Sequence, residues 1–134
     1  MHGLVRQSVT LLLMLITICS MSLADDNAKF IRFSDPSLIQ GRVVWMENCM
    51  GCHAYGTAGA PVPLYPDEWR HRLTKTRTVL YQHAIEGFYG PEDTIMPARG
   101  GNPALSDGQV KRAVDYMVAL ASYYIKKMNT GLTK

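Results

Sequence analysis

The sequence predicts an all-α fold of about four helices joined by long loops. Apolar residues recur at helical spacing over residues 110–121, and no stretch alternates polar and apolar side chains as a half-buried strand would. Two connecting stretches, residues 56–66 and 88–103, are rich in glycine and proline. Loops of this length in a small domain usually have a functional reason. We therefore expect the loops to wrap around a bound group.

The N-terminal residues 1–24 have the pattern of a secretory signal peptide. Arg6 supplies a positive charge, an apolar run follows over residues 9–18, and small side chains stand at Ser22 and Ala24. We expect cleavage after Ala24 and export to the periplasm. A retained membrane anchor is the alternative, although the apolar run is shorter than the roughly 20 residues that a membrane span needs.

The length of the chain predicts one folded domain after the signal peptide. We expect a polar leader at residues 25–36, the domain at residues 37–126 and a C-terminal tail at residues 127–134. The formal net charge of the chain is only +3, which does not favour a nucleic-acid-binding function. No integral membrane segment is expected in the mature form.

The first two helices follow from local signals. The first is expected to begin near Asp35 and Pro36, because these residue types suit an N-cap and a first helical turn. The second is expected over about residues 67–75, where Trp69 and Leu73 share one face.

The third and fourth helices have clearer ends. The third is expected over about residues 78–86, with Gly87 as its C-terminal stop. The fourth begins after Ser106, whose spacing to Gln109 is that of a capping box. Its apolar stripe includes Met117, which we interpret as a core residue.

Cys49, Cys52 and His53 form the C-x-x-C-H motif that marks covalent attachment of c-type haem. Two thiols three positions apart can each form a thioether bond to one porphyrin, and the adjacent imidazole then lies beneath the iron as its proximal ligand. A redox dithiol, a zinc site and a structural disulfide are the alternatives. Dithiol motifs sit on strand–helix units, which are absent from the pattern, and structural zinc needs four protein ligands. The motif therefore predicts one covalent haem c.

The imidazole of His53 needs a partner for its second ring nitrogen, and a backbone carbonyl is the usual one. Pro61 lies close enough in sequence to supply that carbonyl. The alternative is that Pro61 only interrupts the loop.

Met96 is the predicted sixth ligand of the iron. It lies in a loop rich in glycine and proline, and Pro97 restricts its backbone to extended conformations, which suits a ligand presented from a loop. His83 on the third helix is the alternative ligand. A thioether ligand raises the reduction potential, so histidine at this position would give a lower one.

Three groups of residues match a known family. They are Gly41, Trp45 and Cys49 at four-residue intervals, residues 49–54 followed by 58–61, and residues 96–101 followed by 105–107 and 113–117. On these segments the chain resembles the bacterial class I c-type cytochromes, and within them cytochrome c5, over roughly residues 37–122. Many cytochrome c5-like proteins carry a further cysteine where this chain has Asn102.

The resemblance implies a class I cytochrome c fold, with long loops wrapped round one covalent haem. It implies that Gly41 lets the first and last helices approach closely against Tyr116. It also places Trp69 at the haem edge, as a donor to a propionate. Arg99, beside the ligand loop, is a second candidate partner for a propionate.

Together these features predict a periplasmic carrier of single electrons and no enzymatic activity, because an iron with two protein ligands has no open position for a substrate. Its partners would be redox proteins, with membrane-associated respiratory complexes among the candidates. A basic run at residues 70–77 either attracts acidic partners or is a solvated helix face. A cytochrome subunit bound permanently to a periplasmic dehydrogenase or oxidase complex is the alternative function. A haem enzyme or gas binder would follow if Met96 did not bind iron.

Overall fold

The computed structural model describes residues 29–91 and 93–131. The chain divides into two units, Met1–Ile31 and Arg32–Lys134, and every candidate site residue belongs to the second. The predicted signal peptide and its cleavage site lie outside the described residues. Within the described part of the chain, no helix is both long enough and apolar enough to cross a membrane.

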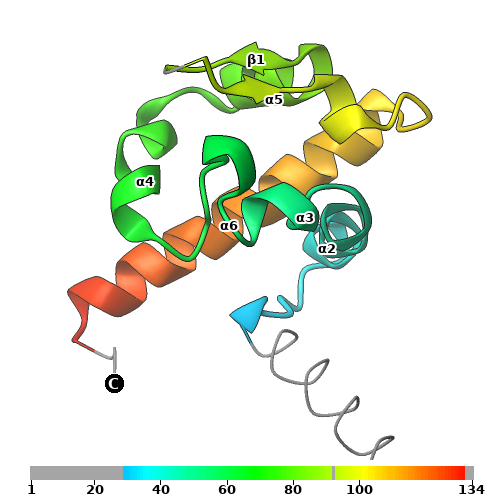
Figure 1. The fold of residues 1–134 in the computed structure, drawn as a ribbon. Coiled ribbons are helices and arrows are strands. Elements are labelled where there is room, and N and C mark those ends of the chain that lie inside the picture. The colour runs from blue at the N-terminus through cyan, green and yellow to red at the C-terminus, as the bar shows by residue number, and fades with distance from the viewer. Residues whose placement is uncertain (1–28, 92, 132–134) are drawn as a thin grey trace, which may run out of the picture. The chain divides into compact units, whose positions relative to one another are not determined.

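The second unit is mainly helical, which confirms the all-α prediction (Figure 1). Short 3-10 turns and a two-stranded hairpin occupy the connections. The elements of this unit are α2 (Pro36–Asn48), α3 (Met50–His53), η1 (Thr57–Gly59), α4 (Pro66–Arg70), η2 (Arg72–Thr74), α5 (Arg77–Glu86), β1 (Phe88–Tyr89), β2 (Ile95–Met96), η3 (Ala98–Gly101) and α6 (Asp107–Asn129).

Helices α2 and α6 begin where the local signals predict. The side chain of Asp35 accepts hydrogen bonds from the backbone N–H groups of Ser37 and Leu38 at 2.8 and 3.0 Å, and so caps α2. Ser106 and Gln109 form the predicted capping box at the start of α6. These bonds join residues two or three positions apart, and sequence therefore suffices to predict them.

The predicted helix over residues 67–75 is interrupted. Helix α4 ends at Arg70, and the 3-10 turn η2 follows. The guanidinium of Arg72 donates to the carbonyl oxygen of Glu68, the group that would accept the next backbone bond of a continuing helix. A side-chain bond thus competes with the helix ladder.

Two further differences concern short or terminal segments. β1 pairs antiparallel with β2, so that Phe88 lies opposite Met96 and Tyr89 opposite Ile95. Strands of two residues have no alternation to detect, and the sequence pattern did not predict them. Helix α6 continues to Asn129, beyond residue 126, where the domain was expected to end.

Helices α2 and α6 are in close backbone contact at Gly41. A Cβ atom at this position would lie 2.8 Å from the carbonyl carbon of Arg112 and 3.1 Å from Cβ of Tyr116. Real Cβ atoms do not approach a carbonyl carbon so closely, so only glycine permits this packing. The ring of Tyr116 also packs on that of Trp45, with centroids 5.6 Å apart, and both residues are fully buried. This arrangement is the one that the family resemblance implied.

A second buried cluster joins α4, α5 and α6. Its members are Trp69, Ala84, Leu105, Val110, Val114, Val118 and Ala121. Met96 and Met117 pack against this cluster from partly buried positions. The cluster therefore connects the hairpin that carries Met96 to the long C-terminal helix.

Candidate haem site

A cavity of about 540 Å³ opens among these elements, and every site residue predicted from the sequence lines it. The volume lies in the range of ordinary cofactor and ligand pockets. The predicted residues on its wall are Cys49, Cys52, His53, Pro61, Trp69, Met96 and Arg99. His83, the alternative sixth ligand, lines the same cavity.

Cys49 and Cys52 are presented by a single helical turn. The backbone N–H groups of Cys52 and His53 both donate to the carbonyl oxygen of Cys49, at 3.2 and 3.0 Å. Both cysteines are free thiols, Cys49 partly buried and Cys52 exposed. Burial, and after it the nearby Cys52, raises the pKa of the Cys49 thiol to about 11. As free thiols that line the cavity, both cysteines can supply sulfur for thioether bonds.

His53 is buried at the end of α3, and its Nδ1 lies 2.9 Å from the carbonyl oxygen of Pro61. A carbonyl oxygen only accepts hydrogen bonds, so Nδ1 carries the proton and Nε2 keeps its lone pair. Burial lowers the pKa of the imidazole; the Pro61 carbonyl raises it and Arg72 lowers it further. The burial therefore favours the neutral ring, which is the form that binds a metal.

Met96 and His83 reach the cavity from neighbouring elements. Met96 belongs to β2, where it lies opposite Phe88. The imidazole of His83 stacks on the ring of Phe88 with centroids 4.1 Å apart, and Lys75 Nζ lies 5.6 Å from the centroid of the same ring. Burial, together with Lys75, lowers the pKa of His83. His83 thus has a ring partner, whereas Met96 packs on the buried cluster.

Trp69 tests whether the cavity suits a haem. Its indole Nε1 is fully buried and is the one buried side-chain nitrogen or oxygen without a hydrogen-bond partner among the residues that the structure describes. Leaving such a donor unpaired costs about 1–3 kcal/mol. A haem propionate is an anionic acceptor that would satisfy it. The two thiols, the imidazole, the thioether and this unpaired donor together fit a covalently held haem.

Arg99 has two partners within the protein that were not predicted from the sequence. Its guanidinium donates to the carbonyl oxygen of Leu105 at 2.8 Å and to the carboxylate of Asp107 at 2.6 Å. Both terminal nitrogens are used in these bonds, which tie η3 to the start of α6. The structure therefore gives Arg99 a role in holding the loop. A guanidinium has five N–H donors and these bonds use two, so a bond from Arg99 to a propionate stays a prediction.

One hydrogen-bonded pair, of which Asn48 lines the cavity, was missed by the sequence reasoning. The side-chain amide of Asn102 donates to that of Asn48 at 2.7 Å. Asn48 lines the cavity immediately before Cys49. No sequence signal could have revealed the pair, because two asparagines that are 54 positions apart follow no recognisable spacing.

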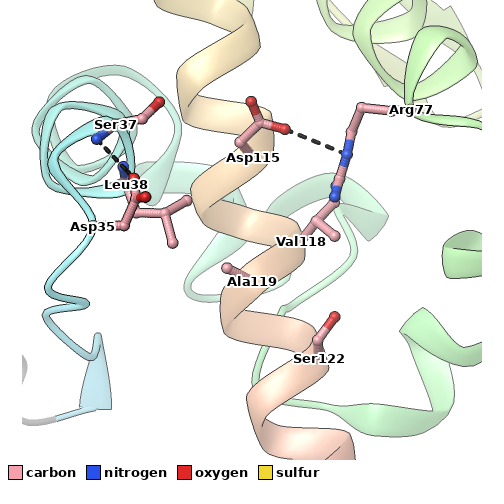
Figure 2. A pocket seen from close by; sticks show the side chains of 8 residues that line it. All are labelled: Asp35, Ser37, Leu38, Arg77, Asp115, Val118, Ala119 and Ser122. Carbon is pink, nitrogen blue, oxygen red and sulfur yellow. Dashed lines mark hydrogen bonds and ion pairs between the residues drawn. The ribbon is translucent and has the colours of Figure 1, made fainter.

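A second hollow, of about 360 Å³, lies between α2, α5 and α6 (Figure 2). It contains the ion pair of Arg77 with Asp115, whose Nε and Oδ1 atoms are 3.3 Å apart. The remaining lining residues are Asp35, Ser37, Leu38, Val118, Ala119 and Ser122. None of the lining residues is a cysteine, histidine or methionine, so the haem chemistry belongs to the larger cavity.

A mainly helical domain with a C-x-x-C-H turn on the wall of a largely apolar cavity defines a class I c-type cytochrome. In keeping with this, residues 36–117 match the family model described as cytochrome c oxidase, cbb3-type, subunit III. This match covers more than half of the chain, and the chain belongs to that family of cytochromes.

The curated relatives include proteins named cytochrome c-555. The protein from Prosthecochloris aestuarii is 40% identical over 84 residues, which cover 60% of this chain and 85% of the relative. The protein from Chlorobaculum thiosulfatiphilum is 38% identical over 78 residues, which cover 58% of this chain and 90% of the relative. These matches establish a monohaem c-type cytochrome with covalently bound haem c. The narrower resemblance to cytochrome c5 stays a prediction.

Proposed function

We propose that this protein is a periplasmic single-electron carrier whose haem is attached through Cys49 and Cys52 and ligated by His53 and Met96. The observation that carries the proposal is the convergence of these four side chains on one cavity, with Nδ1 of His53 already bonded to Pro61. The bound haem supplies the one-electron couple of iron.

The two cysteines make the attachment permanent. Each sulfur can add, together with its hydrogen, across one vinyl group, so the bond forms without an oxidant. The link does not depend on the charge of the iron. The protein can therefore change oxidation state repeatedly without losing its cofactor.

The two side chains that would ligate the iron, His53 and Met96, would set its redox properties. The Pro61 carbonyl orients the ring of His53 and increases the basicity of Nε2. Met96 offers an uncharged thioether, which favours ferrous iron and raises the reduction potential. With both positions filled, no substrate can reach the iron. Electron transfer through the haem edge is then the expected activity, and catalysis is not.

The partners we propose are redox proteins, including membrane-associated respiratory complexes. Within the basic run, Arg70 pairs with Asp67 at 3.4 Å and Arg77 with Asp115 at 3.3 Å. Lys75, in contrast, is exposed at the cavity wall. We therefore assign attraction of an acidic partner to the surface around Lys75, and not to the run as a whole.

A second function is favoured by the family match, whose description names an oxidase subunit. In that case the protein would be a permanent subunit of a periplasmic or membrane-bound complex. Size-exclusion chromatography of native extract distinguishes the two functions. A free carrier elutes at the size of the monomer, whereas a subunit elutes with its complex.

The ligand assignment is tested by spectroscopy of protein made in a host that matures c-type cytochromes. The wild type is expected to be red and low-spin, and to show the weak long-wavelength absorption band that marks methionine sulfur on ferric haem. Met96→Ala should lose this band and bind carbon monoxide. Met117→Ala, which changes another methionine of the same cavity, should keep it.

Two results would contradict the proposal. A colourless wild type would show that the protein does not bind haem. An unchanged spectrum of Met96→Ala would show that Met96 is not the sixth ligand. Loss of low-spin character in His83→Ala would then identify His83 as that ligand.

A further inference from the structure

Two asparagine side chains join the haem-attachment segment to the loop that follows Met96. Nδ2 of Asn102 donates to Oδ1 of Asn48 at 2.7 Å. Asn48 is the last residue of α2 and directly precedes Cys49, while Asn102 directly follows η3. Both side chains are partly buried. The bond therefore connects the two segments that supply the haem with its attachment and its sixth ligand.

The direction of this bond is determined by the other partners of the two amides. Nδ2 of Asn48 donates to the carbonyl oxygen of Val44 at 3.0 Å, which leaves Oδ1 of Asn48 facing Asn102. Oδ1 of Asn102 accepts from the backbone N–H of Ala104 at 3.1 Å, which leaves Nδ2 facing Asn48. Neither amide can rotate by half a turn without placing like atoms against each other. The pair is therefore held in a single arrangement.

The backbone of the loop meets the end of α2 at the same place. A Cβ atom at Gly100 would lie 3.1 Å from the carbonyl oxygen of Asn48. Gly100 and Arg99 both have positive φ angles, of 65° and 55°. This backbone turns sharply, so that the loop reaches α2 immediately before Asn102.

Met96 itself has little local support. Its strand β2 has two residues and pairs with a strand of two residues. A hairpin this small is marginally stable without tertiary contacts. The position of Met96 thus depends on the anchoring of the chain after it, which the Asn48–Asn102 bond and the bonds of Arg99 provide.

We propose that Asn48 and Asn102 form a positioning clasp that keeps Met96 on the haem iron. The inference rests on the proposed function, because it takes Met96 as the sixth ligand. Neither asparagine would be an iron ligand in this arrangement. The clasp biases the equilibrium between ligated and released Met96, and so the access of other ligands to the iron.

Imidazole titration of the ferric holoprotein measures this equilibrium, because imidazole binds the iron only when Met96 leaves it. Asn102→Ala is expected to bind imidazole about fivefold more tightly, the factor that one hydrogen bond of ordinary net strength contributes. Asn48→Ala should give a similar change. The imidazole affinity of the double variant should be close to that of each single variant, because both substitutions remove the same bond.

Asn129→Ala is the matched control. Its amide accepts from Arg70 at 3.4 Å near the C-terminal end of α6, outside the residues that line the cavity. Its imidazole affinity should equal that of the wild type. Should Asn102→Ala fail to mature, Asn102→Asp tests the same bond, because it keeps the acceptor for Ala104 and replaces only the donor. Asn129→Asp then controls for the added charge.

The outcomes separate this inference from the proposed function. Tighter imidazole binding in the asparagine variants, with the methionine band present before titration, supports the clasp. Wild-type affinity in those variants overturns the clasp and leaves the carrier function intact, even if their thermal stability falls. A wild type without the methionine band overturns both.

Discussion

Nδ1 of His53 lies 2.9 Å from the carbonyl oxygen of Pro61. The two residues are eight positions apart, and the turn between them contains η1. This single bond selects the tautomer, since only the ring with its proton on Nδ1 can make it. Burial lowers the pKa of the same ring and thus favours its neutral form. The polypeptide therefore presents an imidazole with a free lone pair on Nε2.

The first prediction concerns the contact of α2 with α6. Gly41→Ala should lower the free energy of unfolding by about 1–3 kcal/mol, because the new methyl group overlaps the backbone of Arg112. Gly51→Ala is the control, since its Cβ would meet no atom within 4 Å. Chemical denaturation of the holoproteins measures both. Equal stability of the two variants would contradict the proposed role of Gly41.

The second prediction concerns Gly87, which ends α5 with φ 91° and ψ 167°. A Cβ atom there would lie 3.0 Å from the carbonyl oxygen of Met96. Gly87→Ala should therefore displace the strand that carries Met96 and weaken the methionine band. The strained backbone should also lower the stability by about 1–3 kcal/mol. Gly131→Ala also strains a residue of positive φ, but its Cβ would meet nothing within 4 Å. An unchanged band in Gly87→Ala would refute the coupling.

Much of the helical framework could be predicted from the sequence because its determinants are local. Asp35 caps α2 and Ser106 caps α6 through bonds to residues at most three positions away. The C-x-x-C-H turn is likewise local, with Cys49 as the N-cap of the short helix α3 and the rest of the motif inside it. His53 and Pro61 are eight positions apart, and a loop of that length readily brings them together.

Features that depend on which of several possible partners a side chain binds could not be predicted in this way. The end of helix α4 at Arg70 depends on the hydrogen bond that the Arg72 side chain donates to the Glu68 carbonyl oxygen. For Arg99 the sequence indicated only a propionate as partner, and the bond to Asp107 is seen only in the folded loop. The sequence pattern indicates which residues are polar, but it does not indicate how they pair.

The third prediction concerns the unpaired indole of Trp69. In the holoprotein, Trp69→Phe should cost about 1.5–3 kcal/mol of stability, the usual contribution of a hydrogen bond to a charged group. It should also change the pH dependence of the reduction potential, because the propionate loses a donor. Trp45→Phe is the control: its Nε1 lies 3.0 Å from the weak acceptor Sδ of Met117. If both substitutions changed the pH dependence of the reduction potential equally, this result would argue against a propionate at Trp69.

The fourth prediction concerns alkaline stability, through the bond from Oη of Tyr81 to Oδ1 of Asp115 at 2.7 Å. Burial first, and then the hydrogen bond to Asp115, raises the pKa of Tyr81 to about 12. The ordinary value for tyrosine is about 10. The folded state thus holds this proton more tightly than the unfolded state does. The stabilisation is fully present below about pH 10 and is lost as the pH rises toward about 12.

At pH 8 the free energy of unfolding of Tyr81→Phe should therefore be about 1 kcal/mol lower than that of the wild type, the typical net value of one hydrogen bond. The difference from the wild type should narrow above about pH 10, where the unfolded wild type begins to ionise Tyr81 while the folded protein still holds the proton. In an absorbance titration of tyrosinate, Tyr81→Phe should show one fewer tyrosine that ionises at high pH. The buried Tyr116, with a pKa of about 12, should still be seen. Tyr65→Phe alters an exposed ring and should change stability by less than about 0.5 kcal/mol. A stability difference between Tyr81→Phe and the wild type that stays constant from pH 8 to pH 12 would show that the Tyr81–Asp115 bond does not raise the pKa of Tyr81.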